Sequence, residues 1–329
     1  MKIPRRKLLH IAVGAAALAA ISQIAGAQSY PTRPITMIVN FPAGGAADAV
    51  GRIIGGSMRA SLGQPIVIEN VTGANGSIGM GRVARAANDG YTITIGSWTT
   101  FVANGVAYTL PYRLLTDFEP IAPLTTQPIL IVAKKVMPSD DLKGLIAWLK
   151  ANPDKATAGT NGVGSPQHVA AIFFQNKTGT RFGFVPYRGG APALQDLLAG
   201  QIDLIFAPAG DAAALIRAGS IKPYAVMAQN RIAALPDLPT VDEAGMPGLY
   251  MSIWSGLWAP AHAAKGVIAK LNTAAVDALA NPAVRARLAA IGQEIFPPDQ
   301  QTPEALGAFH KAEIEKWWPL LKAMNIKGE

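Results

Sequence analysis

Eight residues at one joint of the chain, 41–48 (FPAGGAAD), combine the residue types that a backbone anion site needs. They follow an apolar run at 35–40 that is typical of a buried strand, and they precede a segment at 49–62 that indicates a helix. A strand-to-helix turn with two glycines exposes backbone N–H groups at the positive end of a helix. The sequence therefore predicts that Gly44 and Gly45 form a nest for an anion.

A second glycine-containing loop, 160–168 (TNGVGSPQH), follows the apolar segment 155–159. Ser165 fits a helix N-cap and Pro166 fits the first helical position. His168 is either a local hydrogen-bonding or packing residue, or a contact to a ligand or to the loop that holds it. A hydrolase with Ser165 as nucleophile and His168 as base is an alternative, although nothing nearby supplies the third group that orients such a base.

Three further residues have both a structural and a functional interpretation. Asp48 is either a carboxylate of the first helical turn or a contact to an amine or hydroxyl of the ligand. Trp98 and Phe101 follow a strand predicted at 91–95. They either pack in the core or stack on a ligand at the carboxyl end of that strand. The sequence alone leaves these alternatives open.

Several classes of catalytic and cofactor site are excluded by their missing motifs. The two glycine loops contain neither G-x-G-x-x-G nor a P-loop lysine, and the chain has no G-x-S-x-G and no H-E-x-x-H. The histidines after residue 27 (His168, His262 and His310) are far apart, without a second ligand at metal spacing. Cysteine is absent, which removes thiol nucleophiles and disulfides. We expect no metal, no cofactor and no catalysis.

The first 27 residues have the pattern of a secretory signal peptide. A basic start is followed by an apolar, alanine-rich stretch and by Ala25-Gly26-Ala27, which predicts cleavage before Gln28. The pair Arg5-Arg6 leaves twin-arginine export open beside the general secretory route. Its removal lowers the formal charge from +8 to +4, because it contains four basic and no acidic residues. No basic run with interleaved aromatics follows, so nucleic acid is not an expected partner. We predict a periplasmic protein.

Strands and helices alternate through the rest of the 329 residues, which predicts an α/β fold of two lobes with mainly parallel sheets. Helices are predicted at 141–150, 168–177, 191–198 and 211–217 in the second lobe, and Pro319 is expected to break or kink a last helix at 303–324. Both glycine loops lie at carboxyl ends of strands, where α/β sheets bind ligands. If the lobes face each other, these loops form two sides of one cleft.

The order and spacing of several segments resemble the substrate-binding proteins of tripartite tricarboxylate transporters, also called the Bug family. The resemblance covers nearly all of the chain after the signal peptide. It rests on residues 38–48 (IVNFPAGGAAD), 69–79 (ENVTGANGSIG), 89–93 (DGYTI), 159–168 (GTNGVGSPQH), 186–193 (PYRGGAPA), 196–203 (DLLAGQID) and 235–245 (LPDLPTVDEAG).

This resemblance implies a type II periplasmic binding protein whose two lobes close on an organic carboxylate. It implies lobe 1 at 28–126, lobe 2 at 127–228, and a return to lobe 1 at 229–329. The expected partners are a small organic acid and a membrane transporter of two integral subunits, and we expect a monomer. A sensor that signals to a membrane histidine kinase is an alternative with the same sequence pattern.

Candidate ligand-binding residues follow from the two loops and the resemblance together. They are Phe41, Pro42, Ala43, Gly44, Gly45, Ala46, Ala47, Asp48, Ser97, Trp98, Thr99, Phe101, Thr160, Gly164, Ser165, His168, Tyr187, Arg188, Gly189 and Phe206. The chain departs from the family pattern at Ala46 and Ala47, where a hydroxyl is common, and at Trp98 and Phe101, where small polar residues are common. These departures suggest a ligand with an apolar or aromatic body.

Overall fold

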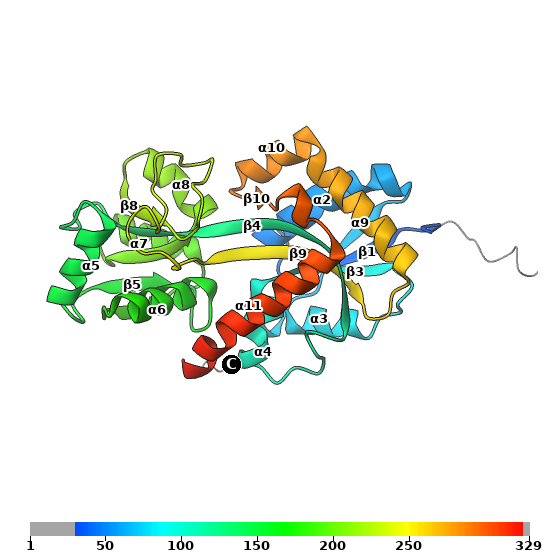
Figure 1. The fold of residues 1–329 in the computed structure, drawn as a ribbon, viewed down its shortest axis with the longest axis horizontal. Helices are drawn as coiled ribbons and strands as arrows, with labels where there is room; N and C mark the ends of the chain where they lie inside the picture. The colour runs from blue at the N-terminus through cyan, green and yellow to red at the C-terminus, as the bar shows by residue number, and fades with distance from the viewer. Residues whose placement is uncertain (1–29, 325–329) are drawn as a thin grey trace, which may run out of the picture.

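The computed structural model describes residues 30–324, so the predicted signal peptide lies outside the described residues. Two strands, β4 (Phe118–Lys134) and β9 (Ser252–Pro260), join the two halves of the molecule (Figure 1). The first part of β4 pairs with β9, and its last six residues pair with β7 (Leu204–Pro208) and β8 (Ile221–Val226). The strand order is β2-β1-β3-β9-β4-β7-β5-β6, with β10 and β8 also paired to β4.

Lobe 1 contains the strands on the β9 side of β4 and the helices around them. Its strands are β1 (Ile35–Val39), β2 (Ile66–Asn70), β3 (Thr92–Ser97), β9 and β10 (Glu294–Ile295), with the first part of β4. Its helices are α2 (Ala46–Leu62), η1 (Ala74–Gly76), α3 (Ser77–Ala84), η2 (Thr99–Ala103), α4 (Asn104–Ala107), α9 (Lys265–Ala280), α10 (Pro282–Ala290), η3 (Pro298–Gln300) and α11 (Pro303–Ala323).

Lobe 2 is built on the other end of β4. Its further strands are β5 (Thr157–Thr160), β6 (Gly183–Pro186), β7 and β8. Its helices are α5 (Leu142–Ala151), α6 (Pro166–Thr178), α7 (Gly190–Leu198) and α8 (Ala209–Arg217). The predicted two-lobed α/β fold is confirmed. The prediction that the sheets are mainly parallel is wrong, because β4 and β9 add antiparallel pairs beside the parallel β1–β2, β1–β3, β5–β6 and β5–β7 pairs, so each lobe has a mixed sheet.

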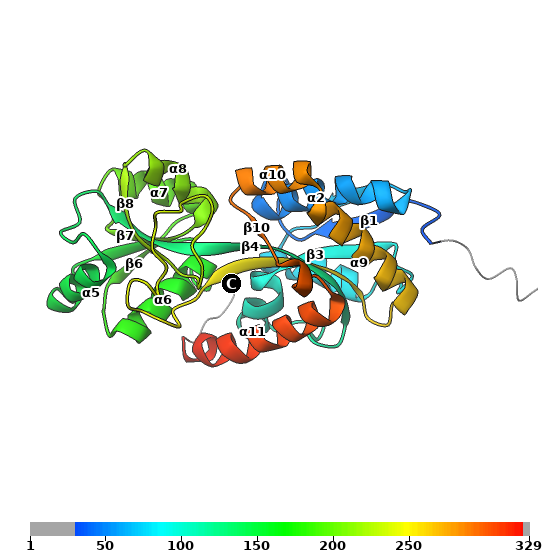
Figure 2. The ribbon, with the colours of Figure 1, turned by 45° about the horizontal axis from the view of Figure 1, so that its top comes forward.

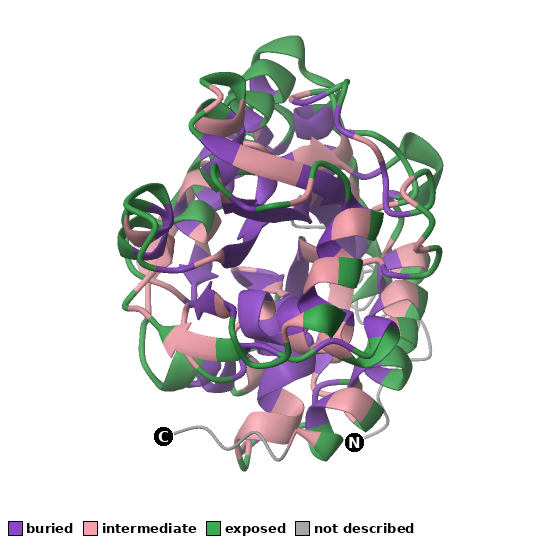
Figure 3. Ribbon diagram, turned by 90° about the vertical axis from the view of Figure 1, so that its left-hand side faces the viewer, coloured by how far each residue is buried: buried purple, intermediate pink, exposed green. Residues whose placement is uncertain are grey.

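Helices cover both faces of each half of the sheet (Figures 1 and 2). In β1, Ile35, Met37 and Val39 face α2, α9 and α10, while Ile38 faces the opposite side, as the alternation of a strand requires. The core on that opposite side is continuous from lobe 1 to lobe 2 and includes α3, α5, α6 and α11. Buried residues accordingly concentrate in the strands, with exposed residues on the outer helical faces (Figure 3).

The topology places the loops that follow β1 and β3 in lobe 1, and those that follow β5 and β7 in lobe 2, at the junction of the lobes. Strand β3 is antiparallel to β9, which starts at Ser252 beside Pro128, so the carboxyl ends of β3 and of its parallel neighbour β1 point to lobe 2. Strand β7 is antiparallel to β4 and ends at Pro208 opposite Ile129. Its parallel neighbour β5 therefore also ends toward lobe 1. The loops after β1 and β5 face each other across the crossover.

The structure departs from the prediction at α2, at β4 and at α11. Helix α2 begins at Ala46, three residues before the predicted start, which puts Asp48 in its first turn. The first part of β4 was missed because Pro120, Pro123 and Pro128 interrupt its pattern; the register shifts between Pro120 and Ala122 and between Pro123 and Thr125, and bulges of this kind accommodate proline. Helix α11 continues through Pro319, so of the predicted break or kink the break is excluded, and the kink stays a prediction.

The boundary predicted between residues 126 and 127 falls inside β4, and the one predicted between 228 and 229 falls two residues after β8. In residues 30–324, no helix has the length and apolar character that crossing a bilayer requires.

Candidate functional site

The loop between β1 and α2 is held by its own hydrogen bonds. Gly44 has a φ of +83°, a conformation that side-chain-bearing residues rarely adopt. Its N–H donates to Oδ2 of Asp48 at 2.9 Å, and the Gly45 N–H donates to the carbonyl of Pro42 at 3.3 Å. Both N–H groups are therefore used inside the loop, which argues against the predicted nest at Gly44 and Gly45.

Asp48 organises this loop from the first turn of α2. Its side chain is buried, and its carboxylate accepts from the Gly44 N–H, from Nε of Arg52 at 2.9 Å and from Nδ2 of Asn70 at 2.9 Å. The hydrogen bond from Arg52, followed by those from Gly44 and Asn70, lowers the pKa of Asp48 to about 2. Asn70 also donates to the carbonyl of Phe41 at 3.0 Å. These contacts favour the structural interpretation of Asp48.

The available donors of this loop lie one residue further on. The first N–H groups of a helix have no intrahelical acceptor, and here they belong to Ala46 and Ala47. Ala46 is exposed and Ala47 is partly exposed. An anion at this helix end would meet two oriented N–H groups and the positive end of the α2 dipole. These N–H groups are the donors that the loop leaves for an anion.

Asp48 makes the free energy of unfolding depend on pH in the acid range. Its pKa in the folded chain is below that of an unfolded aspartate, so its contribution is fully present above about pH 4 and is lost as the pH falls toward 2. We expect Asp48→Asn to lower the free energy of unfolding by about 2 kcal/mol at pH 7 and by much less near pH 2.5. Urea unfolding at both pH values measures this difference. An equal loss at both would contradict this role of the carboxylate.

The corresponding loop of lobe 2 is also closed by local hydrogen bonds. Gly164 has a φ of +78°, and its N–H donates to Nδ1 of His168 at 3.2 Å. Ser165 caps α6, because its Oγ accepts from the His168 N–H at 3.3 Å. Burial lowers the pKa of His168, whose ring packs edge-on against Phe184. The described contacts favour the local role of His168 and join Ser165 to its backbone, not to its ring.

The residues just before α7 add a cationic side chain, Arg188, to the end of lobe 2 that points toward lobe 1. Gly189 is the N-cap of α7 and has a φ of +124°. Tyr187 is fixed in front of it, because its N–H donates to Thr160 O at 2.8 Å and its hydroxyl donates to Asp196 at 2.7 Å. Arg188 is exposed and forms no ion pair with any residue in 30–324. It is the predicted site residue best suited to attract a carboxylate.

Trp98, Phe101 and Phe206 belong to the core. All three are at most 1% exposed. Trp98 packs edge-on against Trp317 at 5.8 Å, and Phe101 stacks on Trp258 with ring centroids 4.1 Å apart. A fully buried ring presents no face to a ligand, so the structure favours the packing alternative. It also removes the basis for expecting an aromatic ligand.

The remaining predicted residues lie in the first loop or at or near the ends of β3 and β5. Phe41 is partly buried, and Pro42 and Ala43 are exposed in the first loop. Ser97 ends β3, and its Oγ is buried without a hydrogen-bond partner in residues 30–324. Thr99 and Thr160 are buried, at 8% and 2% exposure.

A test of the aromatic residues follows from their burial. We expect Trp98→Ala to lower the free energy of unfolding by about 3–5 kcal/mol, because it removes a large ring from a closed core. Ile78→Ala is a control for loss of an apolar side chain, since Ile78 is 56% exposed. Denaturant unfolding of both variants measures the difference. Unchanged stability in Trp98→Ala, with weaker binding of aromatic acids, would restore the stacking interpretation.

Sequence reasoning missed residues that the structure brings to the same edges. Asn70 fixes Asp48, but lies 22 positions away and only the parallel pairing of β1 with β2 brings it close. Gln167 and Asp211 line a small cavity between the first turns of α6, α7 and α8. Gln167 lies within segment 159–168, which resembles the family. Asp211 begins the helix predicted at 211–217, and nothing in the sequence distinguishes it from an ordinary acidic residue of a first helical turn.

Comparisons with known proteins agree with this architecture. The family described as "Tripartite tricarboxylate transporter family receptor" matches residues 50–326. Protein BugT of Bordetella pertussis is 34% identical over 315 residues, which cover 94% of this chain and 95% of BugT. MatC of Rhodopseudomonas palustris, solved with bound malate, is 36% identical, with a TM-score of 0.75 and coverage of 89% of this chain and all of MatC. An R. palustris protein solved with adipate is 32% identical, with a TM-score of 0.77 and coverage of 91% and 99%.

Proposed function

The chain belongs to the tripartite tricarboxylate transporter receptor family, and from that premise we propose that it captures a small organic carboxylate between its two lobes. The family consists of periplasmic solute-binding proteins that work with membrane transporter components. The malate and adipate found in two relatives support a carboxylate as the ligand class here. We further propose delivery to a transporter of two integral subunits and action as a monomer.

One observation carries the proposal: two helix N-termini lie at one junction, and Arg188, which forms no ion pair within residues 30–324, comes directly before the N-cap of one of them. The α2 first turn of lobe 1 and the α7 first turn of lobe 2 lie at edges that point toward each other. Each supplies backbone N–H donors, and Arg188 adds a charge beside α7. Charge-assisted hydrogen bonds of this kind are stronger than neutral ones. A carboxylate is the simplest group that can use both edges.

Lobe closure is the mechanism that follows. A ligand that touches both edges has more contacts when the lobes approach, so its differential affinity favours the closed arrangement. The β4 and β9 crossovers provide the hinge, because they are the strands shared at the junction. The polar groups described in residues 30–324 suffice for such capture, and we propose that no metal or cofactor takes part.

We propose that the protein acts by binding, without catalysis. A serine hydrolase needs its nucleophile within hydrogen-bond reach of a base that a third group orients. Here Ser165 Oγ accepts from a backbone N–H, and Nδ1 of His168 accepts from Gly164. This arrangement supports helix capping and loop closure. We also propose that residues 1–27 direct export to the periplasm and are removed near Ala27.

Native mass spectrometry of the exported protein tests this function. The protein is purified without refolding and then titrated with mono-, di- and tricarboxylates, amino acids and aromatic acids. We expect one acid to bind at one-to-one stoichiometry and to keep its mass during incubation. Failure of every acid to bind would contradict the carboxylate proposal, while a change in the mass of a bound acid would favour an enzyme.

A further inference from the structure

Three helices of lobe 2 begin around one small cavity. α6, α7 and α8 follow the parallel strands β5, β6 and β7, so their N-termini gather at the edge that points toward lobe 1. The cavity between them has a volume of about 10 Å³, which is room for one water-sized group. It is lined by Gly159, Asn161, Gln167, Gly190, Pro208 and Asp211, with four apolar residues behind them.

Gln167 provides this cavity with an unused acceptor. Its side chain is 6% exposed, and its Oε1 has no hydrogen-bond partner in residues 30–324. A buried carbonyl oxygen without a donor is unfavourable by about 1–3 kcal/mol, so such groups are rare unless a ligand or water completes them. A hydrogen-bond donor inside the cavity would satisfy Gln167 Oε1.

Asp211 adds a second acceptor to the lining of the same cavity. It stands in the first turn of α8, and its Oδ2 lies 3.1 Å from where a Cβ on Gly190 would be. Asp211 is exposed on one side, while the atoms packed around its carboxyl raise its pKa by desolvation. None of the hydrogen bonds within residues 30–324 engages this carboxyl group. Its oxygens are available to a ligand.

We propose that this cavity receives a hydroxyl or ammonium group of the ligand, so that the protein selects hydroxy- or amino-substituted carboxylates over unsubstituted ones. The inference rests on the proposed function, because the carboxylate itself is held by the helix ends and Arg188. Gln167 Oε1 and Asp211 are both acceptors, so they complement a donor group and repel a second carboxylate. The cavity volume is sufficient for one such group.

Matched ligand pairs test the inference. Isothermal titration calorimetry compares malate and aspartate with succinate, which has the same carbon chain and carboxylates without the donor group. We expect the wild-type protein to bind malate or aspartate about tenfold or more tightly than succinate, as one hydrogen bond to a charged group allows. We expect Asp211→Ala and Gln167→Leu each to reduce this ratio toward one, with little change for succinate.

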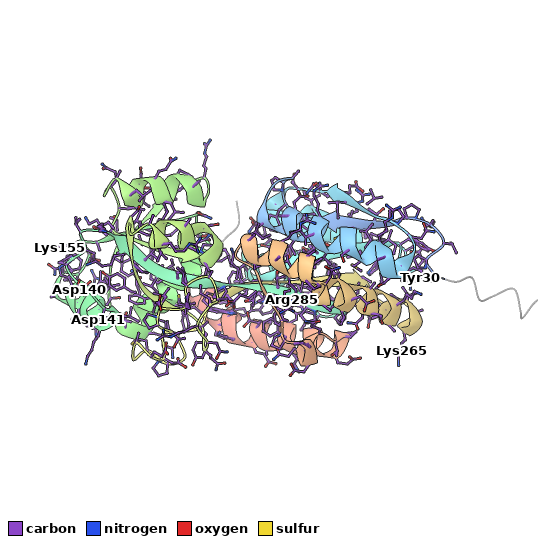
Figure 4. The ribbon with its side chains drawn as sticks, turned by 90° about the horizontal axis from the view of Figure 1, so that it is seen from above. Tyr30, Asp140, Asp141, Lys155, Lys265 and Arg285 are labelled. Atoms are coloured by element: carbon purple, nitrogen blue, oxygen red, sulfur yellow. The ribbon has the colours of Figure 1, made fainter. Side chains whose placement is uncertain are left out.

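Asp211→Asn distinguishes the two donor groups. An amide keeps one acceptor oxygen, so a hydroxyl ligand should lose little affinity, whereas an ammonium ligand should lose more because the charge is gone. Asp140→Ala is the control, because Asp140 is fully exposed at the outer end of lobe 2, away from lobe 1 (Figure 4). Thermal unfolding of every variant checks that it folds.

Each outcome decides between the two proposals. Selectivity that disappears in Asp211→Ala or Gln167→Leu but survives in Asp140→Ala supports the cavity as its source. Equal binding of malate, aspartate and succinate by wild-type protein, or selectivity unchanged in both cavity variants, overturns this inference and leaves carboxylate capture intact. Failure of all acids to bind, including those in the wider mass-spectrometric screen, overturns the proposed function and this inference with it.

Discussion

Asp48→Ala is expected to weaken carboxylate binding by about 10- to 100-fold while the protein stays folded. The variant removes the acceptor that joins Gly44, Arg52 and Asn70 in one cluster. Without it, the turn at Gly44 loses its local restraint and the first N–H groups of α2 lose their fixed direction. Loss of one oriented hydrogen bond to a charged ligand, at about 1.5–3 kcal/mol, gives that range.

The control for this variant removes a carboxylate that also pairs with an arginine but forms no hydrogen bonds to the 41–48 loop. Glu69 pairs with Arg82 on the surface of lobe 1, and its side chain is 43% exposed. Glu69→Ala should leave affinity within about twofold, because exposed ion pairs contribute little. Calorimetric titration with the acid found by mass spectrometry measures both variants. Full affinity in a folded Asp48→Ala protein would show that the loop of residues 41–48 is not part of the site.

The sequence was sufficient for the fold because the strand-and-helix alternation and the family segments are local signals. The first part of β4 is the main element that the sequence did not predict, because its prolines interrupt the pattern of a strand. It forms a strand because β9 pairs with it across bulges. Whether the two loops face each other depends on antiparallel pairings between segments far apart in sequence. That arrangement was predicted conditionally and needed the structure.

The site was predictable at the level of loops and less so at the level of atoms. The segment 41–48 was placed at the correct joint, but its glycine N–H groups are used by Asp48 and Pro42. Whether an N–H group is free depends on where neighbouring side chains lie, which glycine spacing does not encode. Burial of Trp98 against Trp317 is equally a tertiary property, because 219 positions separate the two rings in sequence.

Gly210→Ala is expected to hold the lobes apart and to weaken ligand binding by about 10-fold or more. Gly210, in α8 of lobe 2, lies against the loop after α10 of lobe 1. A Cβ at this position would be 2.6 Å from Nε2 of Gln127 and 2.7 Å from the carbonyl oxygen of Ile291. Overpacking of this kind costs about 1–3 kcal/mol. The lobes can relieve it by separating, which removes contacts that a closed, ligand-bound protein needs.

Gly210 is a cleaner probe of this contact than its neighbour Gly292. Gly292 has a φ of +71°, so alanine there would add backbone strain to the clash, whereas Gly210 is in a helix that alanine favours. Gly56→Ala is the matched control, because a Cβ on Gly56 in α2 meets no atom within 4 Å. Small-angle scattering with and without ligand should show less compaction for Gly210→Ala than for Gly56→Ala or wild type. If Gly210→Ala closes and binds like wild type, the loops at this contact yield without moving the lobes, and the control of closure lies in the crossover strands alone.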